Sequence, residues 1–196
     1  MKKSWIVIIV IVVVLIGFYS MFKGTYNNMV TKGESVDAQW SQVENVYQRR
    51  ADLIPNLVNT VKGYATHEKE TLEGVVEARA KATSVNIDAS NLTPQSMQAF
   101  QKAQDGLSGA LSKLMVVVEK YPDLKANQNF LDLQAQLEGT ENRIAVERKK
   151  FNEKVREYNT YIKTFPNNLY AGMFGFTQKP YFKAAQGSDK APEVKF

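Results

Sequence analysis

The sequence lacks cysteine altogether. This absence excludes disulfide bonds, thiolate metal sites, a cysteine nucleophile and a lipidated N-terminal cysteine. Histidine is nearly absent as well: His67 is the single one, and Thr71 stands where an H-E-x-x-H zinc motif would carry its second histidine. A lone histidine beside Glu68 is more typical of a hydrogen-bonded residue than of a reactive one, so we predict no catalytic residue, metal or cofactor.

The chain also lacks a concentrated charge of one sign. It carries 25 Lys and Arg against 20 Asp and Glu, for a net charge of +5. Its two basic clusters, Arg49–Arg50 and Arg148–Lys150, each have acidic residues close by. Nucleic-acid-binding proteins gather their basic residues on one face, so the sequence argues against a nucleic-acid partner.

The most apolar stretch is residues 5–22, which are 18 residues without a charge. As a helix it would be about 27 Å long, close to the roughly 30 Å hydrocarbon core of a bilayer. A cleaved signal peptide needs small residues after its apolar run, whereas residues 19–23 are mostly large. A buried core helix would carry a polar stripe, which this run lacks. We therefore predict an uncleaved membrane anchor over residues 1–26, contacting lipid through residues 5–22.

The orientation of this anchor is only weakly encoded. Lys2 and Lys3 precede the apolar run, and Lys23 and Lys32 follow it, so the charge difference across it is small. A short, doubly basic N-terminal tail is the part more easily kept inside the cell. The sequence therefore favours a single-pass protein of the cell membrane with its bulk domain on the extracytoplasmic side.

Residues 36–82 show the strongest helical period. Their apolar residues are spaced by threes and fours, which is typical of one face of an amphipathic helix. They are Val36, Trp40, Val43, Tyr47, Ile54, Leu57, Val61, Tyr64, Leu72 and Val75. The spacing predicts one long helix, about 70 Å in length if it is unbroken.

Pro55 lies inside this pattern. Proline removes a backbone N–H group and crowds the preceding turn, so it normally kinks or breaks a helix. Asp52 could cap a new helix if the chain broke there. Because no glycine or loop-like composition surrounds Pro55, we favour a kink over a fold-back.

Two further helices are predicted to return along the first. A small, polar loop over residues 82–92 ends at Thr93-Pro94, an N-cap followed by proline at the first helical position. Apolar residues then recur by threes and fours up to Pro122, and again from Phe130 to Phe165. The fold class predicted is all-α, with residues 27–183 forming an antiparallel bundle of long helices.

Two glycines interrupt the first return helix. Gly106 and Gly109 each cost about 1 kcal/mol relative to alanine in a helix interior. Either they let a neighbouring helix approach closely, or the helix is locally weak, and the pattern favours neither.

Charged residues fall on the core-facing seams of both long helices. Arg50 and Glu68 continue the apolar register of one helix, and Glu141 and Arg148 that of the other. One hypothesis is that they pair across the bundle and set its register, as polar seam residues do in coiled coils. The alternative is that each charge reaches solvent at the edge of a widened stripe.

The end of the chain changes character. Residues 167–182 are aromatic and interrupted by Gly and Pro. They predict an irregular segment docked over a bundle end, or an exposed apolar patch awaiting a partner. Residues 184–196 are predicted to be a flexible C-terminal tail.

A set of long motifs occurs in a recognisable order over nearly the whole chain. They are Gln48–Val58, Val61–Ala65 with His67-Glu68, Glu77–Ala80, Leu137–Ile144, Arg148 with Phe151-Asn152, Val155–Asn159 and Phe165-Pro166. In content and order they resemble the LemA family.

The resemblance implies a bacterial membrane protein with one N-terminal span and an antiparallel bundle of long helices. It implies no established enzymatic activity, so no catalytic residue is carried over. Family members are often encoded beside membrane metalloproteases or small envelope domains, which implies a membrane-protein partner. Candidates for a shared structural or interaction surface are Arg49, Arg50, Asp52, Pro55, Asn56, His67, Glu68, Glu141, Asn142, Arg143 and Arg148.

We therefore predict a non-catalytic, membrane-anchored interaction or scaffold module of the bacterial envelope. Tethering raises the local concentration of a membrane partner. The alternative is an envelope ligand sensor or transport accessory protein, which would need a concave pocket. An enzyme would need a site built from carboxylates. The pocket of the ligand-sensor alternative would join Arg49, Arg50 and Asp52 to Glu141, Asn142 and Arg143.

The partner and the oligomeric state, including a homo-oligomer, are left open.

Overall fold

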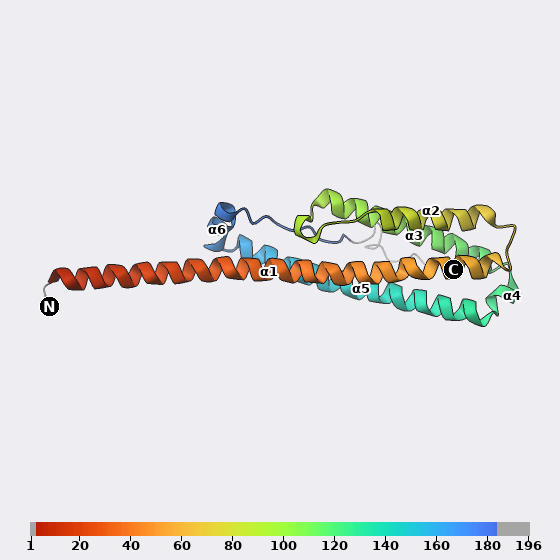
Figure 1. The fold of residues 1–196 in the computed structure, drawn as a ribbon, viewed down its shortest axis with the longest axis horizontal. Helices are drawn as coiled ribbons and strands as arrows, with labels where there is room; N and C mark the ends of the chain where they lie inside the picture. The colour runs from red at the N-terminus through yellow and green to blue at the C-terminus, as the bar shows by residue number, and fades with distance from the viewer. Residues whose placement is uncertain (1–2, 184–196) are drawn as a thin grey trace, which may run out of the picture.

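The computed structural model describes residues 3–183, and all regular elements in that range are helices (Figure 1). The all-α prediction is confirmed. In chain order the elements are α1 (Lys3–Lys62), α2 (Lys69–Ser84), the short 3₁₀ helix η1 (Ala89–Asn91), α3 (Pro94–Val118), α4 (Pro122–Lys125), α5 (Gln128–Lys163) and α6 (Asn167–Phe174).

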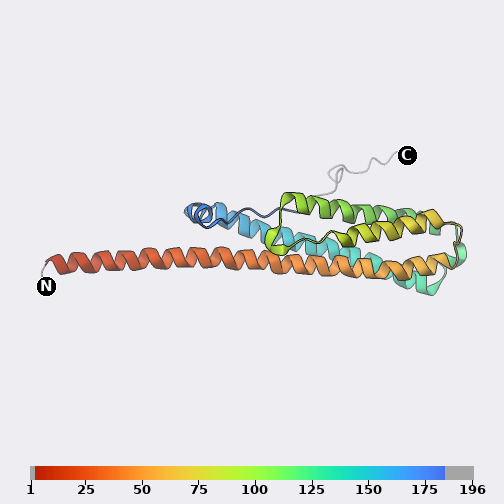
Figure 2. The ribbon, with the colours of Figure 1, turned by 45° about the horizontal axis from the view of Figure 1, so that its top comes forward.

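The four longest helices alternate in direction and form an up-down-up-down bundle (Figures 1 and 2). α5 returns along α1, while α2 and α3 form a second antiparallel pair beside them. Short connections between successive helices favour this topology because they leave each helix next to the one before it. Only part of α1 belongs to the bundle, since its first third extends alone beyond the other helices.

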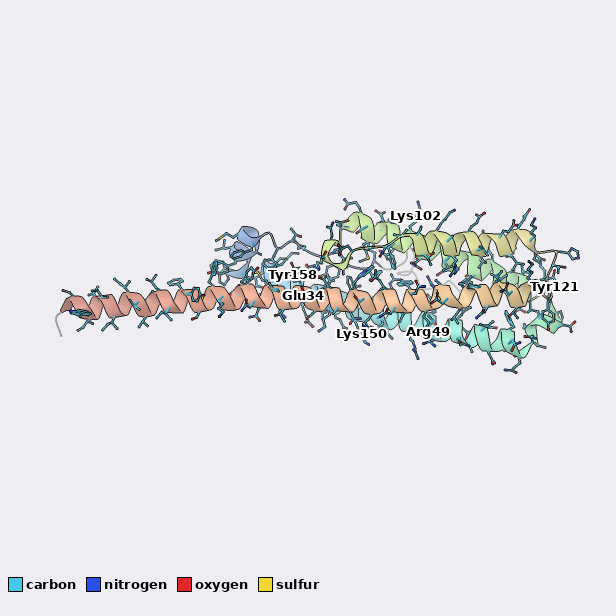
Figure 3. The ribbon with its side chains drawn as sticks, viewed as in Figure 1. Glu34, Arg49, Lys102, Tyr121, Lys150 and Tyr158 are labelled. Carbon is cyan, nitrogen blue, oxygen red and sulfur yellow. The ribbon has the colours of Figure 1, made fainter. Side chains whose placement is uncertain are left out.

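The projecting part of α1 contains the apolar run. Every residue from 4 to 21 is exposed, and no other described element packs against them. Figure 3 shows their side chains pointing outward on all sides of the helix. The most apolar 18 residues of α1 have a mean hydropathy of 2.9. This segment is therefore long and apolar enough to cross a membrane. α1 passes residue 26 without a break, and its first buried side chain is that of Thr25.

The chain reverses at residues 63–68, between α1 and α2. The prediction of one helix over residues 36–82 is therefore wrong. The apolar spacing continues across this turn because α2 packs back against the same core, with Leu72 and Val75 buried. Gly63 begins the turn, where its poor helix propensity favours the end of α1.

Pro55 does not end α1, which continues to Lys62. The chain does not fold back at Pro55, and both ribbon views show α1 as one extended rod. Proline cannot donate to the carbonyl four residues earlier, which belongs to Ala51. The structure supplies another donor, because Nε of Arg79 on α2 lies 2.7 Å from the Ala51 oxygen. Pro55 itself is exposed.

The start of α3 agrees with its predicted cap. The Thr93 side chain accepts a hydrogen bond from the backbone N–H of Ser96, and the Ser96 hydroxyl accepts one from the backbone N–H of Thr93. This reciprocal pair is a capping box, and Pro94 occupies the first turn.

The core of the bundle is divided into two apolar clusters. The proximal cluster, nearer the projecting end of α1, includes Trp40, Phe100, Phe151 and Phe182. The distal cluster lies beyond Arg50 and is mostly aliphatic. Its members are Ile54, Leu57, Val61, Ala65, Leu72, Val75, Ala82, Leu107, Leu114, Val118, Leu124, Phe130 and Leu137.

The segment after α5 is only partly irregular. Residues 167–174 form α6 rather than the irregular segment predicted, and Gly175, with φ of 74°, ends the helix in the left-handed conformation that suits glycine. Residues 175–183, which we call the strap, then run back along the bundle. Phe182 at its end is buried in the proximal cluster. The predicted tail, residues 184–196, lies outside the described residues.

The contact between Arg79 and Ala51 can be tested by a double-mutant cycle with Pro55. We expect Arg79→Met to lower the free energy of unfolding by about 1–3 kcal/mol, because it leaves a half-buried carbonyl without a donor. In the Pro55→Ala background the loss should be smaller, since the restored backbone N–H can serve that carbonyl. Urea unfolding followed by circular dichroism measures both values. Equal losses in the two backgrounds would contradict the proposed compensation.

Candidate functional site

The two apolar clusters meet at a buried polar layer. Arg50 on α1 and Gln104 on α3 are 2% and 6% exposed, and each lies between the proximal and distal clusters along its helix. Glu141 occupies the corresponding level on α5 and pairs with Arg50 at 2.8 Å. The layer is completed from α2 by the carbonyl of Ala82, which accepts a hydrogen bond from Gln104. All four long helices therefore contribute to it.

The guanidinium group of Arg50 makes most of the contacts in this layer. One terminal nitrogen donates to the Glu141 carboxylate and to the Ser108 hydroxyl, at 2.8 and 3.0 Å. The other donates to the side-chain oxygen of Gln104 at 2.7 Å. The group also lies 5.1 Å from the ring centre of Tyr47, whose pKa is raised by burial. A buried charge is tolerated when it is paired in this way, and costs several kcal/mol when it is not.

The predicted pairing across the bundle thus holds for Arg50 and Glu141. Glu68 and Arg148 are placed differently. Glu68 lies in the turn before α2 and accepts a hydrogen bond from the Tyr121 hydroxyl at 3.2 Å. Arg148 is half-buried, with its guanidinium 4.7 Å from the ring centre of Phe182 and a hydrogen bond to the Lys183 carbonyl.

The remaining predicted residues point outward. His67 is exposed in the turn, and Asp52 accepts a hydrogen bond from its neighbour Gln48 on the surface of α1. Figure 3 shows Arg49 on the α1/α5 side of the molecule, opposite Lys102 on the α2/α3 side. The structure does not gather these outward residues into one site; the others are Pro55, Asn56, Asn142 and Arg143.

Two asparagines of α5 hold the strap. The Asn159 amide donates to the Lys179 carbonyl and accepts from its backbone N–H, both at 2.9 Å. Asn152 does the same with Phe182, at 3.1 and 2.9 Å. The spacings match, since seven helical residues and three extended residues each cover about 10 Å. An ion pair between Lys179 and Asp37 adds a contact to α1.

An open groove of about 830 Å³ runs between α2 and α3 on their outer side. Its floor is made of small residues: Gly74, Ala78, Ala103, Gly106, Gly109 and Ala110. A Cβ atom built on Gly74, Gly106 or Gly109 would meet no other atom within 4 Å. The glycines of α3 are therefore not needed for close packing within the chain. The charged residues of the lining are Glu70, Glu77 and Lys81 on α2, and Lys102 and Lys113 on α3.

A second groove, of about 360 Å³, lies between α3 and α5 and reaches the polar layer. Arg50 and Glu141 line it, but Arg49, Asp52 and Arg143 do not. This groove therefore lacks most of the residues that the sensor hypothesis places in one pocket. Within residues 3–183 no group of three His, Asp or Glu side chains is placed to hold a metal ion.

Several residues of these contacts were not singled out from the sequence. Gln104 stands where the apolar spacing between Phe100 and Leu107 would place an apolar residue, and this gap is the available sequence signal for a polar layer. Arg79 lies within a recognised motif, but its acceptor is 28 residues away. Asn152 and Asn159 also lie within recognised motifs, but the motifs do not indicate that their partners are backbone groups of the strap.

The importance of the polar layer can be tested at Arg50. We expect Arg50→Met to lower the free energy of unfolding by about 1–3 kcal/mol, because Gln104 and Ser108 lose a buried donor. Glu141→Gln should cost less than about 1 kcal/mol, since the Glu141 side chain is 58% exposed. Arg49→Met is the matched control on the exposed face and should stay within about 0.5 kcal/mol of the parent chain. Urea unfolding that gives Arg50→Met the same stability as Arg49→Met would argue against the layer.

The attachment of the strap can be tested by proteolysis. We expect Asn152→Leu with Asn159→Leu to speed chymotrypsin cleavage after Phe176 or Tyr181 by about tenfold or more, because each lost hydrogen bond is worth about 1 kcal/mol. Asn142→Leu, an exposed change on the same helix, is the control. An unchanged cleavage rate in the double variant would show that the amides do not hold the strap.

The sequence of this chain is similar to those of several named proteins. Magnetosome protein MamQ 2 of Paramagnetospirillum magneticum is 27% identical over 198 residues, covering 92% of this chain and 73% of that protein. Magnetosome protein MamQ of Magnetospirillum gryphiswaldense is 28% identical over 193 residues, covering 89% and 71%. Protein LemA of Metamycoplasma hominis is 24% identical over 169 residues, covering 86% and 74%.

The names of these relatives specify no enzymatic activity. The sequence profile of the LemA family matches residues 39–196, which include all of the bundle beyond the first part of α1. The chain therefore belongs to the LemA family.

Proposed function

We propose that the chain is a membrane-anchored, non-catalytic adaptor that holds a helix of another membrane protein in the groove between α2 and α3. The proposal includes a single span over the apolar start of α1 and a bundle on the extracytoplasmic side. The short basic tail formed by Lys2 and Lys3 supports that orientation.

The observation that carries the proposal is the combination of glycines and empty space in the groove. Gly106 and Gly109 weaken α3 by about 1 kcal/mol each relative to alanine. They gain no packing within the chain, because a Cβ atom would meet nothing at either position. Small residues allow the backbone of an approaching helix to come close. An occupant from outside the chain accounts for both features.

The groove rims support a helical occupant with charges of its own. Glu70 and Glu77 are seven residues apart, and Lys102 and Lys113 are eleven apart. These spacings correspond to about two and three helical turns, so each pair lies on one side of its helix. The two acidic side chains of α2 and the two lysines of α3 would orient a helix lying between them, as flanking charges do in coiled coils, while Lys81 adds one positive charge at the far end of the α2 side.

The single helix α1 supports the anchoring part of the proposal. It runs from the apolar segment into the bundle core without a linker. A groove attached to such a rod is held at a set direction relative to the membrane, and tethering raises the effective concentration of a membrane partner.

The sensor alternative has less support. The groove that contains Arg50 and Glu141 excludes Arg49, Asp52 and Arg143. Arg50 is also occupied by partners within the chain. A ligand would have to displace those hydrogen bonds before it could bind the guanidinium group.

The adaptor can be tested by crosslinking in native membranes. A photoreactive residue in place of Ala103, on the groove floor, should give an adduct with one membrane protein. Gly106→Leu with Gly109→Leu fills the groove and should abolish most of that adduct. Gly139→Leu is the matched control, because Gly139 on α5 also has open space around it but lies outside the groove.

Adduct yields that are the same in the groove variant and in the control would contradict the proposal. So would the absence of any adduct from chains shown by circular dichroism to be folded. Gly106→Ala and Gly109→Ala provide a further check, since each should raise the stability of the isolated chain by about 0.5–1 kcal/mol.

A further inference from the structure

A group of strongly exposed apolar side chains lies in and just before α6, whereas Val116 on α3, at 66%, is exposed singly. Phe165, Leu169 and Met173 are 76%, 60% and 70% exposed. Leu169 and Met173 are four residues apart, so they share one face of α6, and Phe165 precedes them by the same interval. The opposite side of the helix is covered, since Ala171 is buried in the proximal cluster. α6 is therefore an amphipathic helix with one face packed and one apolar face open.

α6 is held at the point where the apolar part of α1 ends. The ring of Phe22 lies 5.2 Å from that of Tyr170 and 5.3 Å from that of Phe174. Tyr26, one turn further along α1, lies 5.0 Å from Phe174. Figures 1 and 2 show α6 beside α1 at the end of the bundle from which the bare helix projects.

Aromatic residues mark the same level. Trp5 lies near one end of the uncharged run, and Tyr19, Phe22 and Tyr26 lie near the other. The 18 residues from Trp5 to Phe22 cover about 27 Å of helix, close to the thickness of a hydrocarbon core. Aromatic side chains gather at both membrane–water interfaces of a span. This pattern puts the interface at Phe22, where α6 is attached.

We propose that α6 is a second membrane contact, whose face of Phe165, Leu169 and Met173 inserts into the headgroup region of the bilayer that α1 spans. The inference rests on the proposed anchoring of α1. The occupant is lipid because α6 packs on Phe22 and Tyr26, at the end of the apolar segment of α1 that the proposed anchor places in the bilayer. Lys23 directly follows Phe22, Lys163 ends α5 two residues before Phe165, and both suit the phosphates of anionic headgroups. Two contacts with the membrane, a span and an interfacial helix, fix the tilt of the bundle.

The inference can be tested with spin labels, because the chain has no cysteine of its own. Single variants Leu169→Cys and Met173→Cys are labelled in the full-length chain, reconstituted into vesicles of phosphatidylethanolamine and phosphatidylglycerol. Electron paramagnetic resonance then compares collision with oxygen, which dissolves in lipid, and with a water-soluble nickel chelate. Asn168→Cys, exposed on another face of α6, and Asn129→Cys, exposed at the start of α5 at the far end of the bundle, are the controls.

We expect oxygen collisions to exceed nickel collisions at positions 169 and 173, and the ratio to reverse at positions 168 and 129. A water-like ratio at 169 and 173 would overturn the inference, as would shielding from both reagents, which would indicate a covering protein. Val12→Cys, within the apolar run of α1, separates the two proposals. A lipid-like label at position 12 with water-like labels on α6 contradicts the interfacial helix alone, whereas a water-like label at position 12 contradicts the anchor itself.

Discussion

The guanidinium group of Arg50 lies at the level where the apolar core of the bundle is interrupted. It reaches α5 through Glu141 and α3 through Gln104 and Ser108. Gln104 in turn reaches α2 through the carbonyl of Ala82. Apolar contacts are non-directional and tolerate a helix sliding by one turn, whereas a buried charge does not. The alignment of the four helices therefore depends on keeping these partners opposite Arg50.

The same alignment determines what the bundle presents to its surroundings. The groove between α2 and α3 is held in a set position relative to α1, which carries the apolar segment, because the polar layer joins all three helices. Arg79 contributes to that relation, because it joins α2 to the carbonyl that Pro55 leaves free in α1. At the other end, the strap returns from α6 to the proximal cluster and is held by Asn152 and Asn159. The strap thus connects α6, at the end of the bundle from which α1 projects, to the core.

Much of the fold could be predicted from sequence because helical periodicity reports directly which faces are buried. The apolar start of α1 and the cap at Thr93 follow from local composition. The register puts Arg50 and Glu141 on core-facing seams, but it leaves pairing across the bundle and exposure to solvent as alternatives. Periodicity says nothing of chain direction, however. The turn at residues 63–68 was missed because α2 buries its apolar face against the same core that α1 faces. α6 was not predicted because its glycine and aromatic residues have low helix propensity. The helix is stabilised instead by packing of Tyr170 and Phe174 on Phe22.

The candidate site could be predicted only in part. Arg49, Asn142 and Arg143 all match motifs of the LemA family, but they do not lie together in one site. Residues that are neighbours in the sequence of a helix point to different faces of it. The groove was hidden for a different reason. It depends on the space around Gly106 and Gly109, and the sequence alone left close packing and local weakness as equal interpretations. The positions of atoms around the two glycines distinguish a groove from a packed contact.

Native-state hydrogen exchange tests most directly whether the polar layer makes the two apolar clusters unfold as one cooperative unit. If Arg50 and its partners couple the two clusters, backbone amides around Val43 and around Leu57 should exchange with the same opening free energy, as parts of one cooperative unit. Two distinct free energies, one for each apolar cluster, would show that the halves unfold independently and would contradict the account.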